Sequence, residues 1–328
     1  MVEDFISYND DKKHTILVAE DSVIIQKIMD QILEFNNYNR LFAANGTLAL
    51  EIIKNKKVDL LISDINMPGM NGIELIKKLN EENIKIPYIL MTDQDIDKFL
   101  KIALENDIGN ILSKPLKKDE VLSLIYKHIT QKGFFGLENY LYFGIEELKR
   151  IKIVSSNQIE KGIDLIIESA INHGMPSELQ LQFKLILMEL ISNAVYHSHG
   201  RTDLKLQRKH YNLPEGKYVE IKYGYDGHKF GVGITDFMGT LSKKIIIETL
   251  IDLRDRDKKI NEALKKGEDI SKYLKTSGRG LHITRELSPE YCFNIQRGVK
   301  TEVIILATFS EDEKKKVRSH QIKINEIY

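Results

Sequence analysis

The sequence predicts an α/β protein of two domains, in which a doubly wound parallel sheet of five strands is followed by an α+β sandwich. Three observations lead to this prediction. Between residues 14 and 130, five short apolar runs alternate with five longer amphipathic segments. After residue 150, two amphipathic segments come first and most of the strand-like runs follow them. The chain of 328 residues is also longer than a single typical core needs.

Short runs of aliphatic and β-branched residues predict the strands of the first domain, and segments with helical spacing of apolar residues predict its helices. The strands are expected at residues 15–19, 38–43, 58–63, 87–91 and 109–113. The helices are expected at residues 23–35, 47–54, 72–79, 95–105 and 117–129. Because a helix follows each strand, the strands should run parallel, with helices covering both faces of the sheet.

Changes in composition predict the domain boundaries. We expect a polar extension at residues 1–13, the first domain at 14–130, a linker at 131–150, the second domain at 151–310 and a charged tail at 311–328. The second domain is expected to begin near residue 151 with a strand-like segment. Helices are then expected at 157–172 and 178–197, and strands at 218–224, 229–235, 291–296 and 301–308. Residues 242–275 carry charges of both signs, and we interpret them as exposed helices rather than as a lid or a partner surface.

The balance of charge and the single cysteine narrow the class of protein. Lys and Arg total 48, as do Asp and Glu, so the formal net charge is zero. This balance argues against nucleic acid and anionic membranes as partners, because both need a basic surplus. Cys292 is the only cysteine, which excludes an internal disulfide, and its apolar neighbours predict a buried position. The polar N-terminus and the lack of a long apolar run predict a cytoplasmic protein.

Acidic residues stand where two predicted strands of the first domain end. Glu20 and Asp21 follow the first strand, and Asp64 follows the third. The carboxyl ends of parallel strands meet at one edge of the sheet, so these three carboxylates should lie together if the two strands are neighbours. Crowded carboxylates repel one another unless a cation neutralises them. An oxygen-rich site of this kind suits Mg²⁺.

Two further residues at strand ends complement the acids. Lys114 supplies a positive charge, and Thr92 supplies a hydroxyl that can donate to an oxyanion. A metal ion, an ammonium and a hydroxyl around one carboxylate form a binding site for the three oxygens of a phosphoryl group. We therefore interpret Asp64 as a nucleophile in phosphoryl transfer. Pro115 directly after Lys114 is a candidate for a cis peptide bond.

At these residues the chain resembles a response-regulator receiver domain. The resemblance covers residues 14–130 and rests on Glu20-Asp21, Asp64-x-x-Met67-Pro68-x-Met70-x-Gly72, Thr92 and Lys114-Pro115. It implies a flavodoxin-like fold, Asp64 as the phosphoacceptor, and an upstream sensor histidine kinase. It also implies that Mg²⁺ is bound by Asp21, Asp64 and the backbone carbonyl of Asn66, with Glu20 assisting. Two positions depart from the family pattern: Ile111 replaces the usual aromatic residue, and Asp93 replaces the usual small residue.

A row of polar residues and two later segments carry the chemistry of the second domain. Glu189, Asn193 and His197 are spaced i, i+4 and i+8, so they share one face of a predicted helix. Asp236 ends a predicted strand three residues before Gly239. The segment Ser277-Gly278-Arg-Gly280 opens a predicted helix with glycines, whose free backbone N–H groups can meet a phosphate. A polar row alone would be typical of a solvated helix face, but in this order the three features favour a nucleotide site.

Together these segments resemble the N, G1 and G2 boxes of the histidine-kinase-like ATPase (Bergerat-type) fold, and within it the anti-sigma-factor serine kinases. The resemblance covers residues 151–309 and implies ATP with Mg²⁺ as cofactors. It implies that Asn193 holds the metal on the ATP phosphates and that Asp236 accepts the adenine amino group. Gly239, Gly278 and Gly280 would shape the phosphate lid, Thr301 would lie near the adenine, and Glu189 would act as general base. His197 would either contact phosphate or be structural. The first glycine box reads Asp-Phe-Met-Gly rather than the commoner Asp-x-Gly-x-Gly.

These resemblances lead to three hypotheses about function. The first is a response regulator whose phosphorylation at Asp64 controls an ATP-dependent protein serine/threonine kinase or partner switch, acting on a regulatory protein of the anti-sigma or anti-anti-sigma type. The second is a module that binds ATP without catalysis and sequesters its partner. The third is an atypical histidine kinase, for which the candidate acceptor is His173, the only histidine between the first domain and the polar row that begins at Glu189. A DNA-binding output finds no support, and a homodimer is one option for the oligomeric state.

Overall fold

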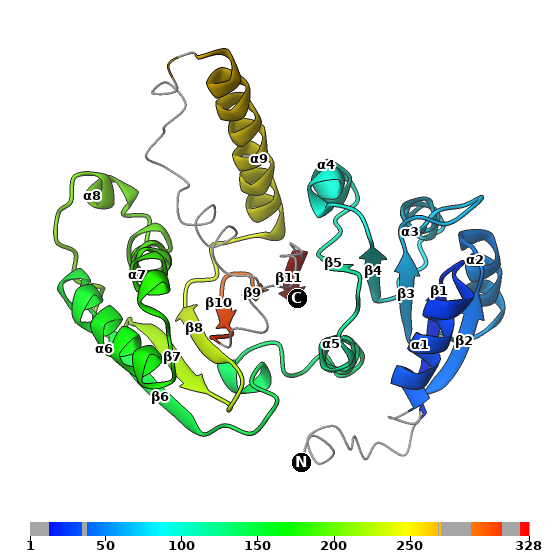
Figure 1. Cartoon of the computed structure of the whole chain (residues 1–328), viewed down its shortest axis with the longest axis horizontal. Helices are drawn as coiled ribbons and strands as arrows, with labels where there is room; N and C mark the ends of the chain where they lie inside the picture. The colour runs from blue at the N-terminus through cyan, green and yellow to red at the C-terminus, as the bar shows by residue number, and fades with distance from the viewer. Residues whose placement is uncertain (1–12, 35–37, 268, 270–289, 310–321, 328) are drawn as a thin grey trace. The chain divides into compact units, whose positions relative to one another are not determined.

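The computed structural model describes residues 13–34, 38–267, 269, 290–309 and 322–327. The described residues form two compact units (Figure 1). The first unit contains the chain up to Ile96 together with Asn110–Phe134. The second contains Asp97–Gly109 together with the chain from Phe135 onward.

A parallel sheet of five strands forms the centre of the first unit, as predicted. The strands are β1 (Thr15–Ala19), β2 (Asn39–Ala43), β3 (Leu60–Asp64), β4 (Tyr88–Thr92) and β5 (Asn110–Ser113), in the order β2-β1-β3-β4-β5. The helices of the unit are α1 (Val23–Glu34), α2 (Gly46–Asn55), α3 (Gly72–Glu81) and α5 (Lys118–Thr130). The observed boundaries lie within two residues of the predicted ones, except where residues 35–37 are not described.

Burial on both faces explains why the strands of the first unit are continuous apolar runs. Ile16 and Val18 of β1 point into a core formed with α1 and α5. Leu17, which lies between them in sequence and points to the opposite face, is also fully buried. A strand that is buried on one face only would alternate apolar and polar residues, and this strand does not.

One expected helix of the first domain is divided. Residues 95–105 form a 3-10 turn (η1, Ile96–Phe99) and a short helix α4 (Leu100–Glu105). The segment Asp97–Gly109 belongs to the second unit, where it packs against helix α9 (Lys243–Lys266). Arg254 Nη1 donates to the carbonyl of Asp97 at 2.9 Å, and Lys243 Nζ lies 2.9 Å from Asp107 Oδ2. These contacts within the second unit explain why the segment is grouped with it.

The second unit is built on a mixed sheet. Its described strands are β6 (Glu147–Ile153), β7 (Val219–Tyr225), β8 (Phe230–Asp236), β9 (Glu290–Gln296), β10 (Lys300–Ala307) and β11 (Ile322–Ile327). Their order is β6-β7-β8-β10-β9-β11, and neighbouring strands are antiparallel except β9 and β11. The first residues of β6 lie in the segment expected as a linker, and β11 lies in the segment expected as a charged tail.

Two long helices cover one face of this sheet (Figure 1). They are α6 (Ile159–Asn172) and α7 (Ser177–Ser192), and α7 continues into a π-helical turn, η4 (Asn193–His197), before the short helix α8 (Thr202–Leu206). Ile163, Ile166 and Leu187 are fully buried against strand residues such as Ile221 and Val232. In the charged segment 242–275, where exposed helices were expected, the described residues form one helix, α9, which ends at Lys266. Residues 270–289 lie outside the described part of the chain.

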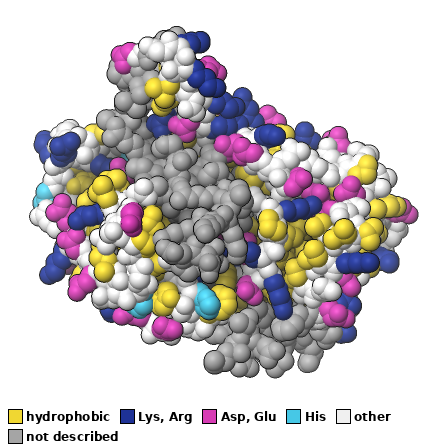
Figure 2. All heavy atoms as spheres, viewed as in Figure 1, with side chains coloured by type: hydrophobic (Ala, Val, Ile, Leu, Met, Phe, Trp, Pro, Cys, Tyr) yellow, Lys and Arg dark blue, Asp and Glu magenta, His cyan; other side chains and the backbone are white. Residues whose placement is uncertain are grey.

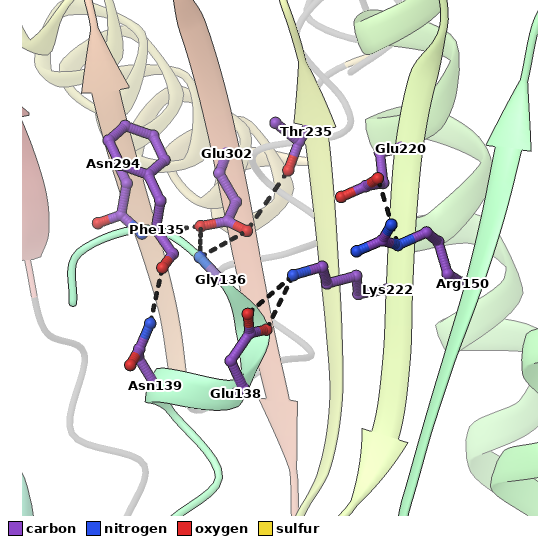
Figure 3. A network of polar contacts seen from close by, with 10 residues as sticks. All are labelled: Phe135, Gly136, Glu138, Asn139, Arg150, Glu220, Lys222, Thr235, Asn294 and Glu302. Carbon is purple, nitrogen blue, oxygen red and sulfur yellow. Dashed lines mark hydrogen bonds and ion pairs between the residues drawn. The ribbon is translucent and has the colours of Figure 1, made fainter.

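The segment Gly136–Leu141 covers the opposite face of the second sheet (Figure 3). Leu137 and Leu141 are buried with Cys292, which is 3% exposed, as its apolar neighbours predicted. Gly136 N–H donates to both carboxylate oxygens of Glu302, at 2.9 and 3.1 Å. Burial raises the pKa of Glu302, and this backbone donor opposes the shift. The buried carboxylate therefore ties the start of this segment to the sheet.

Charges on the surface are mixed. Figure 2 shows acidic and basic side chains intermingled over the coloured part of the face in view, in agreement with the zero net charge. Among the described helices, none combines the length and the apolar character needed to cross a bilayer.

Candidate functional site

The neighbouring strands β1 and β3 bring three acidic residues to one edge of the first sheet. Glu20 follows β1 directly, and Asp64 is the last residue of β3. Carboxylate oxygens of Glu20, Asp21 and Asp64 lie within 4.8 Å of one another. Glu20 and Asp64 are 1% and 5% exposed, whereas Asp21 is exposed. The structure thus brings the three sequence-predicted carboxylates into one cluster.

Lys114 binds two of these acids. Its Nζ lies 2.7 Å from Glu20 Oε2 and 2.8 Å from Asp64 Oδ2. Burial raises the pKa of Glu20, although the hydrogen bond from Lys114 opposes this shift. Burial alone would lower the pKa of Lys114, but its hydrogen bonds to Asp64 and Glu20 outweigh that effect and raise it. The lysine therefore stays charged and compensates part of the negative charge of the cluster.

The second oxygen of Asp64 is open. Among the described residues, Oδ1 of Asp64 has no hydrogen-bond partner, although it is buried. Thr92, at the end of the adjacent strand β4, is fully buried, and its hydroxyl accepts from the Gln94 N–H at 3.0 Å. The hydroxyl proton of Thr92 remains available to a second acceptor. One oxygen of Asp64 is thus held by Lys114, and the other is free to bind or react.

Close packing explains the residues that follow Asp64. A Cβ atom added at Gly72 would lie 2.2 Å from the Asp64 carbonyl, so only glycine allows α3 to begin this close to β3. Asn71 caps α3 by accepting from the Ile73 and Glu74 N–H groups. Met70 lies against Gly46, where an added Cβ would be 2.6 Å from the Met70 carbonyl. These contacts fix the loop between Asp64 and α3, which contains Asn66.

The donor set of this cluster fits Mg²⁺. Carboxylate and carbonyl oxygens are the ligands that this ion prefers, and Glu20, Asp21 and Asp64 each offer a carboxylate oxygen here. The exposure of Asp21 gives the ion access from solvent. The two positions that depart from the family pattern differ in burial: Ile111 is 1% exposed within β5, and Asp93 is exposed directly after Thr92. The predicted cis bond between Lys114 and Pro115 is present.

A second candidate site lies on α7 and η4 of the second unit. Glu189 is in the last turn of α7, and Asn193 and His197 begin and end the π-helical turn. Such turns are frequent at functional sites. Lys205 of α8 reaches the first two residues: its Nζ lies 2.9 Å from Glu189 Oε2 and 2.7 Å from Asn193 Oδ1. The sequence did not predict a role for Lys205, because this residue lies beyond α7 and has no helical spacing to Glu189 and Asn193.

His197 is also in contact with α8. Its Nδ1 lies 2.8 Å from the Thr202 hydroxyl. Burial and the positive charge of Lys205 lower the pKa of His197, and Glu189 opposes this shift. Each member of the predicted polar row therefore has a partner on α8. His173, the alternative acceptor, directly follows α6. Its Nδ1 lies 2.8 Å from the Ser169 carbonyl, and the centroid of its ring lies 4.6 Å from that of Tyr225.

Asp236 and Thr301 face each other on β8 and β10. The two residues are partners in the antiparallel register and are 8% and 2% exposed. Asp236 Oδ1 accepts from the backbone N–H groups of Met238 and Gly239, at 3.0 and 3.1 Å. Burial raises the pKa of Asp236, and these donors oppose the shift. Within the described chain, the Thr301 hydroxyl is buried without a well-formed hydrogen bond.

The second unit contains the kinds of polar group that could hold a nucleotide and a metal ion, although Lys205 contacts two of them. The Asp236 carboxylate and the Thr301 hydroxyl lie on neighbouring strands, β8 and β10, and the Asn193 amide and the Glu189 carboxylate lie on η4 and α7. Val195 of η4 and Ile234 of β8 share one hydrophobic core, so these two elements pack together. At Gly239, φ is +59° and an added Cβ would be 2.4 Å from the Gln296 carbonyl, so the turn requires glycine. Gly278 and Gly280 lie outside the described residues.

The family match from comparison with known proteins lies in the N-terminal part of the chain. Residues 16–126 match the family of the response regulator receiver domain. The chain is 29% identical over 120 residues to sporulation initiation phosphotransferase F of Bacillus subtilis, covering 36% of this chain and 95% of that protein. It is 29% identical over 136 residues to a cyclic di-GMP phosphodiesterase of Thermotoga maritima, covering 42% of this chain and 36% of that protein.

Among solved structures, the signal receiver domain of an HD domain-containing protein from Pseudomonas fluorescens Pf-5 is 27% identical, with a TM-score of 0.35, covering 37% of this chain and 97% of that one. The chain spans only 36% of the length of the Thermotoga maritima protein. Residues 16–126 are a response regulator receiver domain, which implies an upstream phosphodonor.

Proposed function

We propose that Asp64 accepts a phosphoryl group from a sensor histidine kinase, and that its phosphorylation controls the second unit. One observation carries the first part: Lys114 holds Oδ2 of Asp64 at 2.8 Å, while Oδ1 is buried without a partner among the described residues. When one oxygen of a carboxylate accepts a hydrogen bond that fixes its orientation and the other oxygen has no partner, the second oxygen can act as a nucleophile.

The proposed reaction is a transfer from a phosphorylated donor to Asp64. Oδ1 of Asp64 forms a bond to phosphorus as the bond between phosphorus and the donor atom breaks, and the donor retains the bonding electrons. Lys114 and the Thr92 hydroxyl stabilise the negative charge on the transferred oxygens. When bound by Asp21, Asp64 and the Asn66 carbonyl, with Glu20 assisting, Mg²⁺ would neutralise further charge on these oxygens.

Intact mass measurement tests this step. We expect the full chain to gain one phosphoryl group when incubated with acetyl phosphate and Mg²⁺. Asp64→Asn and removal of Mg²⁺ with EDTA should each abolish the gain. The matched control is Glu189→Gln, a carboxylate-to-amide change in the other unit, which should be phosphorylated like the wild type. A mass gain that persists in Asp64→Asn would show that another residue is the acceptor.

For the second unit we propose an ATP-binding output domain of the anti-sigma serine kinase type, acting on a regulatory protein as kinase or partner switch. Its support is the pairing of Asp236 with Thr301 on adjacent strands and of Glu189 with Asn193 on one helix face. Asp236 would accept the adenine amino group, Asn193 would hold the metal, and Glu189 would remove the proton of a substrate hydroxyl. Gly239, Gly278 and Gly280 would surround the phosphates, and His197 would lie near them.

One contact favours the second candidate, a module that binds ATP without catalysis and sequesters its partner. The carboxylate of Glu189 is paired with Lys205 and is therefore not free to act as a base. Transfer of label from ATP to a co-purified partner separates the two candidates. Transfer that is lost in Glu189→Ala indicates a kinase, and nucleotide-dependent partner binding without transfer indicates sequestration.

Nucleotide binding by the full chain tests the proposal for the second unit. We expect Mg²⁺-dependent binding of ATP, with a loss of at least about tenfold in affinity for Asn193→Ala, since an interaction with a charged group is worth about 1.5–3 kcal/mol. Asn172→Ala, at the exposed end of α6, is the matched control and should bind like the wild type. If the wild type binds no ATP, the second unit is not a nucleotide-binding domain.

A further inference from the structure

Helix α8 contacts the whole polar row of the second candidate site. Lys205 donates to Glu189 and Asn193, and Thr202 contacts His197. The helix is tied to the site also through the backbone, because Arg201 N–H donates to the Tyr196 carbonyl at 2.8 Å. These contacts bring one positive charge of α8 to the side chains proposed to serve the nucleotide.

The ammonium of Lys205 contacts the oxygen atom that a metal ion would bind. Its Nζ lies 2.7 Å from Oδ1 of Asn193, which is the proposed metal ligand. It also neutralises the carboxylate of Glu189, the proposed base. An ammonium in contact with this oxygen repels a divalent cation that approaches the same atom. Binding of the metal is therefore favoured when Lys205 moves away.

Lys205 is able to move. Its side chain is 22% exposed, and that of Glu189 is 29% exposed, so the pair lies at the border of solvent. Lysine has a flexible four-carbon stem, and an ammonium regains hydration when it leaves such a pair. A partly exposed ion pair of this kind can be broken at modest cost.

We propose that Lys205 is an internal competitor of the metal–nucleotide complex, so that α8 acts as a latch which keeps the second site closed. This inference rests on the proposed nucleotide function of the second unit. With the latch closed, Asn193 is not free for the metal and Glu189 is not free as a base. With Lys205 displaced, both side chains are released together.

Nucleotide titration of the full chain tests the latch. A fluorescent ATP analogue is titrated at fixed Mg²⁺, and Mg²⁺ is titrated at fixed analogue. We expect Lys205→Met to bind the complex about tenfold tighter than the wild type, which corresponds to about 1.4 kcal/mol. The same variant should reach half-saturation at a lower Mg²⁺ concentration. Without nucleotide, it should unfold at a lower temperature, because Glu189 and Asn193 lose their partner.

Two further variants keep the result interpretable. Thr202→Val removes the contact with His197 without changing charge, and it should tighten nucleotide binding in the same direction by about twofold. Lys184→Met removes another lysine of the same unit, one that pairs with Asp164 at 2.9 Å on the exposed side of α6 and α7, and it should leave binding unchanged.

The outcomes separate the latch from the proposed function. If the wild type binds nucleotide and Lys205→Met binds it equally or more weakly, the latch is overturned, and weaker binding identifies Lys205 as a phosphate ligand. If Lys205→Met does not fold, an unchanged affinity in Thr202→Val overturns the latch. If neither the wild type nor any variant binds nucleotide with Mg²⁺, the proposed function fails and the latch fails with it.

Discussion

Each of the two units contains a lysine that joins two residues of a candidate site. Lys114 lies 2.7 and 2.8 Å from Glu20 and Asp64, and Lys205 lies 2.9 and 2.7 Å from Glu189 and Asn193. The distances are alike, but the consequences differ. Lys114 leaves one oxygen of Asp64 open, whereas Lys205 takes both the proposed base and the proposed metal ligand. Two hydrogen bonds from a lysine therefore leave the first site able to react, whereas two similar hydrogen bonds keep the second site from binding a metal.

The difference follows from the elements that carry the lysines. Lys114 directly follows β5, the strand beside β4, and its side chain is 14% exposed. Its backbone N–H donates to the Thr92 carbonyl at 2.7 Å, so the lysine belongs to the sheet. Lys205 is on a helix of five residues outside the sheet, and its side chain is 22% exposed. A lysine held by a buried strand end is a fixed part of its site, and one on a short surface helix can leave.

The largest effect that this comparison predicts is that of Lys114→Met. Removal of one partner from a largely buried ion pair leaves Glu20 and Asp64 uncompensated and should cost about 3 kcal/mol in the free energy of unfolding of the receiver. Phosphorylation by acetyl phosphate should also be lost. Urea denaturation and intact mass measure the two effects. The comparison fails if Lys114→Met destabilises no more than Lys184→Met, which breaks an exposed ion pair.

A second prediction concerns Asp236, a buried carboxylate that accepts hydrogen bonds from the backbone N–H groups of Met238 and Gly239. Because burial raises its pKa in the folded state, its contribution to stability is full below its unfolded pKa and is lost as pH rises through the folded value. Asp236→Asn should therefore stabilise the nucleotide-free protein at pH 7.5 by about 1 kcal/mol, since the desolvated charge is removed. The amide oxygen can still accept from Met238 and Gly239. Binding of ATP should be lost.

Thermal unfolding at two pH values checks the effect of Asp236→Asn. The gain in melting temperature at pH 7.5 should shrink as the pH is lowered towards the ordinary value of 3.8, where the wild-type carboxyl is neutral as well. Glu20→Gln is the companion variant, because burial raises the pKa of Glu20 too, but Lys114 compensates that residue. Its gain should be smaller. A larger gain for Glu20→Gln would mean that Lys114 compensates the acids less than the geometry indicates.

The smallest predicted effect is that of Asp93→Ala. Asp93 is exposed directly after Thr92, so its charge repels an approaching anionic phosphodonor. Its removal should increase the rate of phosphorylation by acetyl phosphate about threefold at low salt. At 1 M salt the advantage should disappear, because exposed charges are screened. A rate gain that is independent of salt would assign the effect of Asp93 to its size rather than to its charge.

Much of the receiver could be predicted because its signals are local. A strand that is buried on both faces is an apolar run, and an acid at its end interrupts that run, so the five strands and the acids at their ends followed from the order of residues. That Glu20, Asp21 and Asp64 form one cluster depended on β1 and β3 being neighbours in the sheet. The second unit was harder to predict. β11 lies in a charged segment and becomes a strand by pairing with β9. β6 is largely exposed, and only its last part, near residue 151, was expected as strand-like.

By itself, the sequence determined which chemical groups end the parallel strands and which polar residues share the face of α7, because spacing along a strand or a helix sets these relations. Tertiary structure alone decided that Lys205 reaches Glu189, a residue 16 positions earlier in the chain, and that one oxygen of Asp64 stays open while the other is held. The physical reason is that a contact between elements depends on how their surfaces pack, and no period in the chain records it.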